Sequence, residues 1–390
     1  MQKERNRDMQ YRKFGKLDWK VSALGFGAMR LPVVNKNQGN IDEPESIRMI
    51  RYAFDHGVNY IDSAWVYHGG NSEVVMGKAL QDGYREKVRI ATKLPAPEVK
   101  ASADFDRFFN EQLKRLQTNR IDFYLLHGLN PARWKLLQSL GFVKWLENKI
   151  AAGQIGYTGF SFHDSFEAFQ ELIDSYDNWT LAQIQYNYLD ENIQAGTRGL
   201  EYAHKKGLAV IVMEPIKGGR LITFPEKVAG IWKEAPIQKT PQEWALRWVW
   251  NHPEVSVVLS GMSTMEQVAE NVGFAEYSQP HNLTADELSL IGRVRDSFRA
   301  LSPVSCTACR YCMPCPNGID IPGVFEYYNE ATIFNDAVKR RAMYNDPKIF
   351  KAEQRGDKCI KCEQCLEKCP QKISIPEQLE KAHAFLTAKQ

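Results

Sequence analysis

Short apolar runs alternate with longer amphipathic runs over residues 20–275 of this 390-residue chain. Eight of the apolar runs are nearly continuous, which is typical of parallel strands that are buried on both faces. These runs are Ala23–Met29, Asn59–Ser63, Val88–Lys93, Phe123–His127, Tyr157–Phe162, Ala182–Tyr186, Ala209–Met213 and Val255–Leu259. The helical patterns between them include Pro44–Asp55, Ser102–Leu116, Val143–Ala151, Phe166–Asp174 and Pro241–Asn251. These strand–helix units predict an α/β fold in which eight strands close into a (β/α)8 barrel of the TIM type.

The ends of several predicted helices carry their own signals. Thr264 precedes Gln267 by three residues, which is the spacing of an N-terminal capping box. Gly57, Gly153 and Gly207 stand where helices are expected to stop, since glycine is common just past a helix C-terminus.

An open dinucleotide-binding sheet is the competing fold. Its fingerprint requires three glycines between a strand and a helix. Gly25 and Gly27 come nearest to it, but the third glycine is missing and loop residues follow in place of a helix. The pattern therefore favours the closed barrel.

All eight cysteines lie in the last quarter of the chain, in two groups that each end in Cys-Pro. Three thiolates separated by two residues hold one 4Fe–4S cluster, and a fourth cysteine before proline usually ligates the other cluster. Zinc is the alternative, but structural zinc sites use pairs of ligands separated by a longer loop. The spacing predicts two clusters with crossed ligation. One is expected on Cys306, Cys309, Cys312 and Cys369, and the other on Cys359, Cys362, Cys365 and Cys315.

One step in the first cysteine group is irregular. Cys315 follows Cys312 with two residues between them, where the usual motif has three. Pro316 redirects the chain directly afterwards, so the shorter step can still reach a cluster; the alternative is that Cys315 stays unbound.

The segment between the two cysteine groups has helical periodicity and no strand pattern. It runs from Pro316 to Lys358, longer than the hairpin-rich link of a compact ferredoxin, and it resembles the α-helical ferredoxin modules of respiratory reductases. We therefore expect a barrel over residues 1–282, a connecting helix over 283–300 and a small, mainly α-helical ferredoxin-like iron–sulfur domain over 301–390.

Ionisable side chains follow successive strands where a barrel of this kind carries its chemistry, at the carboxyl ends. Asp62 stands at the end of the second predicted strand, Lys93 at the end of the third and His127 at the end of the fourth, and Tyr67 lies just beyond Asp62. Each has an ordinary structural explanation: a capping acid, a lysine reaching solvent, a packing tyrosine and a core histidine. Their occurrence together at neighbouring strand ends predicts one active site.

The residues around this set resemble the aldo-keto reductase family. The resemblance rests on the segment from Asn59 to Glu73, on Thr92-Lys93 and on Leu125-Leu126-His127, and it covers about residues 10–280. With the cysteines, the chain resembles the subgroup that carries a C-terminal ferredoxin-type extension. The resemblance implies that Tyr67 protonates a carbonyl oxygen as hydride arrives at carbon, with His127 orienting that carbonyl. Lys93, held by Asp62, is expected to lower the pKa of Tyr67.

The resemblance also implies a nicotinamide cofactor, NADP or NAD, bound at the same end of the barrel. Ser161 and Gln183 match the residues that hold the carboxamide, although Phe162 stands where the family usually has asparagine. Met213 takes the place of an aromatic ring that stacks on nicotinamide, and a thioether can make that contact. The full set of expected cofactor-binding residues is Gly27, Met29, Asp62, Ser161, Gln183, Met213, Pro215, Gly218, Gly219, Gly261, Gln267 and Asn271.

The expected adenosine end lacks the basic side chains that bind a 2′-phosphate. Gly261, Met262 and Gln267 supply no cation, so discrimination against NADH is expected to be weak. The alternative is that another basic residue, Lys217 or Arg220, reaches the phosphate.

Charge and composition indicate which classes of binding partner and which cellular compartment to expect. The formal net charge of +3 is spread along the chain, which gives no reason to expect nucleic acid. The N-terminal segment has charge but no apolar core, and no apolar run is long enough for a membrane span, so neither a signal peptide nor a membrane contact is expected. Clusters held by thiolates need a reducing compartment, which points to the cytoplasm.

These features predict an NAD(P)H-dependent oxidoreductase that acts on a small-molecule carbonyl or alcohol. Nicotinamide transfers two electrons as hydride, whereas a 4Fe–4S cluster passes one at a time, and no segment indicates a flavin site. The clusters are therefore structural, exchange electrons with a flavoprotein or ferredoxin partner, or sense oxygen. The alternative function is a redox-sensing or adaptor protein that binds nicotinamide without significant turnover.

Overall fold

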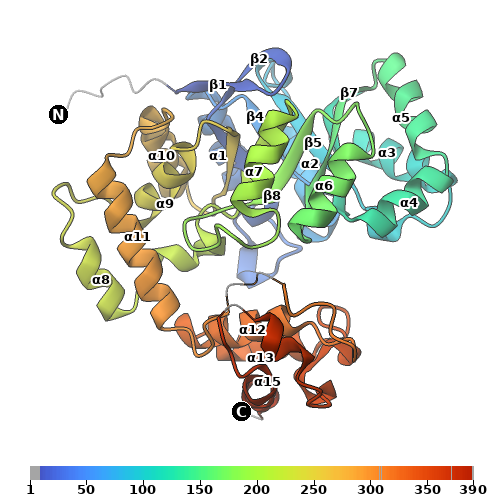
Figure 1. Ribbon diagram of the computed structural model, residues 1–390. Helices are drawn as coiled ribbons and strands as arrows, with labels where there is room; N and C mark the ends of the chain where they lie inside the picture. Colours follow the sequence, from blue (N-terminus) through green and yellow to red (C-terminus); the bar gives the residue numbers. More distant parts are fainter. Residues whose placement is uncertain (1–8, 307, 309, 370, 389–390) are drawn as a thin grey trace. The chain divides into compact units, whose positions relative to one another are not determined.

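Eight parallel strands close into a barrel in the order β10-β3-β4-β5-β6-β7-β8-β9 (Figure 1). The computed structural model describes residues 9–306, 308, 310–369 and 371–388. The barrel strands are β3 (Leu24–Gly27), β4 (Tyr60–Asp62), β5 (Arg89–Leu94), β6 (Ile121–Leu129), β7 (Ile155–Phe162), β8 (Leu181–Gln185), β9 (Ala209–Met213) and β10 (Val255–Gly261). The predicted barrel is confirmed, and every strand end lies within two residues of its predicted position.

An antiparallel hairpin that was not predicted precedes the barrel. It pairs β1 (Tyr11–Phe14) with β2 (Leu17–Ser22). Phe14 and Val21 belong to the same buried cluster as barrel residues such as Tyr60 and Phe123. The Phe14 and Phe123 ring centroids are 4.8 Å apart. Phe123 lies toward the start of its strand, so the hairpin fills the amino-terminal end of the barrel and leaves the carboxyl end for the site.

Helices follow the strands as the periodicity predicted. They are α1 (Glu43–Asp55), α2 (Asn71–Ala79), α3 (Ala103–Arg115), α4 (Pro131–Ser139), α5 (Phe142–Ala151), α6 (Phe166–Asp174), α7 (Gly196–Lys205), α9 (Pro241–Trp250) and α10 (Met265–Phe274). The Thr264 side chain accepts a hydrogen bond from the Gln267 amide at 3.3 Å, which confirms the predicted cap. Gly57, Gly153 and Gly207 all have positive φ just after a helix, as expected for glycines that end helices.

The chain divides into two compact units. The second consists of Tyr188–Ile193, Gly219–Pro241 and Ala285–Gln390, so two segments from the barrel region belong to it. Its helices are α8 (Glu226–Trp232), α11 (Ala285–Ala300), α12 (Ile321–Ile333), α13 (Ala337–Asn345), α14 (Gln364–Lys368) and α15 (Ile375–Thr387). The predicted helical link between the cysteine groups is therefore confirmed by α12 and α13.

The core of the second unit lies among α12, α13 and α15. Val324, Phe325, Tyr344 and Leu379 are all buried there, and several cysteines pack against this cluster. The cysteine-bearing loops thus rest on a helical core that the unit builds for itself.

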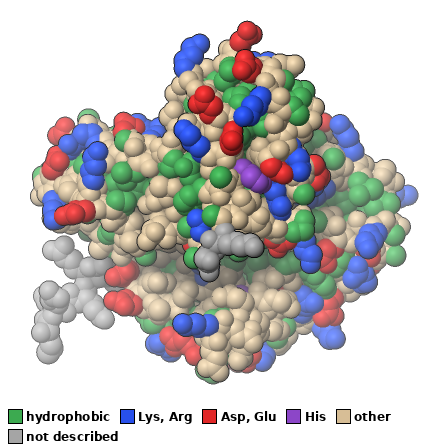
Figure 2. All heavy atoms as spheres, turned by 90° about the horizontal axis from the view of Figure 1, so that it is seen from below, with side chains coloured by type: hydrophobic (Ala, Val, Ile, Leu, Met, Phe, Trp, Pro, Cys, Tyr) green, Lys and Arg blue, Asp and Glu red, His purple; other side chains and the backbone are tan. Residues whose placement is uncertain are grey.

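Charged side chains of both signs are interspersed on the face that Figure 2 presents. Within the described part of the chain, no helix is long and apolar enough to cross a membrane.

Candidate active site and cluster cavities

The four predicted catalytic residues come together at the carboxyl end of the barrel. Asp62 is the last residue of β4, Lys93 is the last but one of β5, His127 is near the end of β6, and Tyr67 begins the 3-10 turn η3 (Tyr67–Gly70). The Lys93 Nζ atom donates hydrogen bonds to Asp62 Oδ1 at 2.5 Å and to the Ser63 carbonyl oxygen at 2.6 Å. It lies 5.0 Å from the centroid of the Tyr67 ring. The Tyr67 and His127 rings meet edge to face with their centroids 5.9 Å apart.

The buried ion pair between Lys93 and Asp62 sets the charge of this site. Their side chains are 1% and 3% exposed. Burial alone would lower the pKa of Lys93, but the Asp62 carboxylate, together with Tyr67, raises it above its ordinary value. Lys93 is therefore held as an ammonium ion.

The pKa of Tyr67 differs from the expectation. Burial raises it above the ordinary value for tyrosine, and the Lys93 ammonium only partly offsets that rise. Lys93 acts in the expected direction, but desolvation of the phenolate is the larger effect. Tyr67 is consequently a protonated phenol at neutral pH, which is the form that a proton donor needs.

His127 is uncharged at neutral pH. Burial and the positive charge of Lys93 lower its pKa to about 3. A neutral imidazole can donate one hydrogen bond to a substrate oxygen without competing for the proton of Tyr67.

The shifted pKa of His127 predicts a pH-dependent stability. Its pKa is about 3 in the folded protein and near 6.5 when unfolded, so the unfolded state binds more protons between these values. The stabilisation is complete above about pH 6.5 and is lost progressively as the pH falls toward 3. We expect denaturant titrations of His127→Gln to give a smaller loss of unfolding free energy between pH 7 and pH 5 than wild type. Equal losses in the two proteins would contradict the depressed pKa.

Two buried polar side chains that are expected to hold the carboxamide lie side by side on neighbouring strands. Ser161 on β7 is paired in register with Gln183 on β8, and both are buried. The Ser161 hydroxyl accepts a hydrogen bond from the Gly128 amide at 2.9 Å. The Gln183 Oε1 atom has no hydrogen-bond partner among the described residues. An unpaired buried acceptor fits a ligand that brings an amide donor, as the carboxamide of nicotinamide does.

The other expected contacts near the nicotinamide lie at the same end of the strands. Gly27 is the last residue of β3 and Met213 the last of β9, while Pro215 is buried two residues further on. Met29 was predicted within the first strand, but it lies in the 3-10 turn η1 (Ala28–Arg30) and is 56% exposed. The strand β3 therefore ends at Gly27, and the turn η1 begins at the next residue.

Sequence reasoning missed one basic residue at the expected phosphate end. A Cβ atom added to Gly218 would lie 3.0 Å from Arg30 Nη2, and one added to Gly261 would lie 3.1 Å from the Arg30 side-chain carbons. Arg30 therefore runs between Gly218 and Gly261 with its guanidinium at Gly218. The signal in the sequence is the position of Arg30 directly after the first predicted barrel strand, far from residues 217–220 and 261–267 along the chain.

The polar side chains at the expected adenosine end form hydrogen bonds with the loop that carries them and with its neighbours. The Gln267 Oε1 atom accepts from the Ser263 amide at 2.8 Å, and the Ser263 hydroxyl donates to the Arg30 carbonyl oxygen at 2.7 Å. Asn271 is buried and donates to the Ser260 hydroxyl at 2.9 Å. This loop and the backbone of Arg30 are thus held to each other.

The two alternative cations, Lys217 and Arg220, lie in different surroundings from those of Arg30. Lys217 is buried. Arg220, within the second unit, forms ion pairs with Glu330 at 2.8 Å and with Asp336 at 3.3 Å. Gly219, which precedes it, has a φ of 93° that favours glycine.

The cysteines of the second unit line two cavities. One is lined by Cys315, Cys359, Cys362 and Cys365 and also touched by Cys312; the other is lined by Cys306, Cys312 and Cys369. Cys309 lies outside the described residues. Each cavity combines cysteines from both sequence groups, and Cys315 and Cys369 are the ones that cross. This grouping of the described cysteines is the one that crossed ligation predicts.

Comparison with known proteins identifies the class of this chain. Residues 23–294 match the family model described as "Aldo/keto reductase family", and residues 305–373 match the one described as "4Fe-4S dicluster domain". The chain therefore belongs to the aldo/keto reductase family, with a C-terminal domain of the 4Fe–4S dicluster type.

Individual relatives match the barrel over most of their length. An L-galactose dehydrogenase of Arabidopsis thaliana is 26% identical over 75% of this chain and 97% of its own. A putative voltage-gated potassium channel subunit beta of Schizosaccharomyces pombe is 27% identical over 70% of this chain and 89% of its own. The holo form of an aldo-keto reductase from Bacillus halodurans aligns with a TM-score of 0.60 and 28% identity, covering 73% of this chain and 96% of that one.

Proposed function

We propose that the protein reduces a small-molecule carbonyl, or oxidises the corresponding alcohol, with NADPH or NADH as hydride donor. The observation that carries the proposal is the convergence of a buried Asp62–Lys93 ion pair with Tyr67 and His127 at the carboxyl end of the barrel. When bound, the nicotinamide supplies a hydride to the carbonyl carbon.

The residues of the chain handle the proton and the developing charge. Tyr67 is protonated and gives its proton to the carbonyl oxygen as the oxygen becomes negative. The phenolate left on Tyr67 is stabilised by the Lys93 ammonium, which Asp62 keeps charged and oriented. Neutral His127 orients the carbonyl oxygen through a hydrogen bond. In alcohol oxidation Tyr67 first loses its proton to solvent, and the phenolate then accepts the proton of the alcohol hydroxyl as hydride leaves the carbon.

We assign the cofactor to Ser161 and Gln183 at the carboxamide and to Gly218 and Arg30 at the phosphates. Because the Arg30 guanidinium lies at Gly218 and its carbon chain at Gly261, its charge serves the pyrophosphate. The 2′-phosphate then has no dedicated cation, which supports weak discrimination between NADPH and NADH.

We expect Arg30→Ala to raise the dissociation constants of NADPH and NADH by a similar factor. A factor of about ten corresponds to about 1.4 kcal/mol, typical of one exposed charge-assisted hydrogen bond. Fluorescence titration of both reduced cofactors against wild type and variant measures the two factors. If the variant lost affinity for NADPH alone, Arg30 would bind the 2′-phosphate and not the pyrophosphate.

We also propose that the second unit holds two 4Fe–4S clusters in its two cysteine-lined cavities. Such clusters pass single electrons, whereas nicotinamide transfers two as hydride, so electron exchange between them would need the flavin of a partner flavoprotein. A ferredoxin partner could exchange electrons with the clusters alone. Clusters held by eight thiolates also favour the reducing environment of the cytoplasm.

A binding function without turnover is the second candidate, and one observation favours it. The relative from Schizosaccharomyces pombe is described as a channel subunit although it matches the same barrel. Steady-state assays of cluster-loaded protein with NADPH, NADH and a panel of aldehydes and ketones separate the two. Carbonyl-dependent cofactor oxidation supports the enzyme, whereas tight cofactor binding without turnover of any carbonyl supports the binding function.

A further inference from the structure

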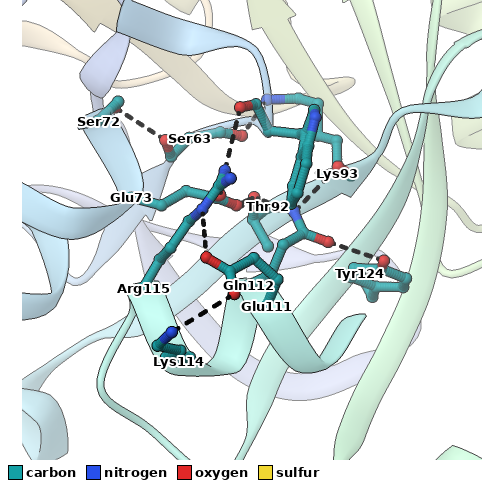
Figure 3. A network of polar contacts seen from close by, with 11 residues as sticks. Ser63, Ser72, Glu73, Thr92, Lys93, Glu111, Gln112, Lys114, Arg115 and Tyr124 are labelled. Atoms are coloured by element: carbon teal, nitrogen blue, oxygen red, sulfur yellow. Dashed lines mark hydrogen bonds and ion pairs between the residues drawn. The ribbon is translucent and has the colours of Figure 1, made fainter. Parts of the chain in front are cut away.

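A buried carboxylate that the mechanism does not use contacts Thr92, the residue before Lys93 on β5. Glu73, in α2, is fully buried. Burial raises the pKa of Glu73, and hydrogen bonds from Thr92 and Gln112 and the charge of Arg115 act against that rise. Figure 3 shows Glu73 among polar side chains from β5, α3 and β6.

One set of contacts ties Glu73 to the strand end that carries Lys93. The Thr92 hydroxyl donates to Glu73 Oε1 at 2.5 Å, and Gln112 Nε2 donates to the same oxygen at 2.7 Å. The Gln112 side chain also donates to the Lys93 carbonyl oxygen at 3.1 Å. The Tyr124 hydroxyl donates to Gln112 Oε1 at 2.8 Å, which fixes the orientation of that amide (Figure 3). Lys93 is thus anchored through its own carbonyl oxygen and its neighbour Thr92.

A second set of contacts ties Glu73 to the turn that carries Tyr67. The other carboxylate oxygen of Glu73 pairs with Arg115 Nη1 at 3.2 Å. Arg115 stacks on the Trp65 ring at 3.8 Å. A Cβ atom on Gly70 would lie only 2.9 Å from Arg115 Nη1, so the guanidinium packs against this residue too. Trp65 and Gly70 flank Tyr67 in sequence, so Arg115 holds its turn on both sides.

We propose that Glu73 is a positioning residue of the active site, which fixes the strand end of Lys93 and the turn of Tyr67 relative to each other. It touches neither substrate nor cofactor. One carboxylate oxygen of Glu73 accepts hydrogen bonds from Thr92 and Gln112, on the side of the Lys93 strand. The other oxygen pairs with Arg115, on the side of the Tyr67 turn. The inference rests on the proposed carbonyl reduction, because the distance between Lys93 and Tyr67 matters for the proton that Tyr67 gives to the carbonyl oxygen.

The charged and titratable groups that face Glu73 come from three elements. Arg115 on α3 is its ionic partner, Tyr124 on β6 reaches it through Gln112, and Lys93 on β5 is linked through its backbone. Glu111 contacts the same guanidinium from the solvent side, with 3.2 Å between Arg115 Nε and its Oε1 atom. Glu111 therefore offers a matched control, because it shares Arg115 but not the link to Lys93.

The test compares Glu73→Gln with Glu111→Gln and wild type. In Glu73→Gln, an amide group replaces one acceptor, and the bridge between the two elements loosens. We expect kcat for carbonyl reduction to fall about tenfold to a hundredfold, as misplacement of catalytic groups by an ångström or less can cause. The dissociation constant of NADPH should stay within about twofold, and Glu111→Gln should behave as wild type.

The second readout is the titration of Tyr67 itself. Tyrosine labelled with ¹³C in the ring gives a signal that is assigned by its absence in Tyr67→Phe, and its pKa is followed by NMR. An opposite charge at close range lowers a pKa by about 1–3 units, so a weaker influence of Lys93 should move the Tyr67 titration upward by about half a unit or more. In a variant that is only less stable, the Tyr67 signal would lose intensity but its pKa would not rise.

Thr92→Val provides a milder form of the same test if Glu73→Gln fails to fold. It removes the hydroxyl that donates to Glu73 and should produce a smaller loss of kcat with the same upward move of the Tyr67 titration. An unchanged Tyr67 titration in a folded Glu73→Gln or Thr92→Val protein overturns the inference. The NMR titration needs no turnover, so it decides this question even if the wild-type protein reduces no carbonyl, a result that would instead contradict the proposed function.

Discussion

Replacing Tyr67 with phenylalanine is expected to lower kcat for carbonyl reduction by about 10²–10⁴-fold, the usual contribution of a general acid. The ring stays, so its edge-to-face contact with His127 at 5.9 Å is kept and only the proton donor is lost. The dissociation constants of NADPH and NADH should therefore change by less than about twofold. Single-turnover kinetics with a good aldehyde substrate, together with cofactor titration, measure the two effects separately.

Tyr60→Phe is the matched control for this experiment. Tyr60 is buried on β4, and its hydroxyl has no hydrogen-bond partner within the described part of the chain. Removal of that hydroxyl should leave kcat close to wild type. Full turnover in Tyr67→Phe, or an equal loss in Tyr60→Phe, would be incompatible with Tyr67 as the proton donor.

Cys315→Ser and Cys369→Ser are each expected to damage a single cluster, and not the same one. Cys315 lines the cavity of Cys359, Cys362 and Cys365, whereas Cys369 lines that of Cys306 and Cys312. Anaerobic wild-type protein should contain about eight iron and eight sulfide per chain if both cavities hold a 4Fe–4S cluster. Iron and sulfide analysis and electron paramagnetic resonance of the reduced variants distinguish the two losses.

The short step between Cys312 and Cys315 makes this prediction easy to contradict. If Cys315 were not a ligand, Cys315→Ser would leave both cluster signals unchanged. About four iron per chain in fully loaded wild-type protein, or zinc in place of iron, would contradict two 4Fe–4S clusters.

The sequence was most informative where a residue's role depends on local pattern. The eight strands are buried on both faces, so their apolar runs mark them without further context. Asp62, Lys93 and His127 stand at strand ends, and closure of a parallel barrel necessarily brings such ends together.

The features that the sequence did not reveal depend on contacts between distant segments. Arg30 became a candidate phosphate ligand only because the fold brings it beside Gly218 and Gly261. The bridging position of Glu73 requires α2, β5 and α3 to be packed together. The raised pKa of Tyr67 is likewise a consequence of burial, which a one-dimensional pattern does not quantify.

The most direct test of the proposed reaction follows the hydride itself. Anaerobically prepared, cluster-loaded protein is given an aldehyde and NADPH that carries deuterium in both positions at C4, in ordinary water, and the alcohol is analysed by mass spectrometry. Direct transfer beside Tyr67 and Lys93 predicts one deuterium on the carbinol carbon of every product molecule and a solvent-exchangeable hydrogen on its oxygen. Product without deuterium, or no product from any aldehyde that is tested, would contradict it.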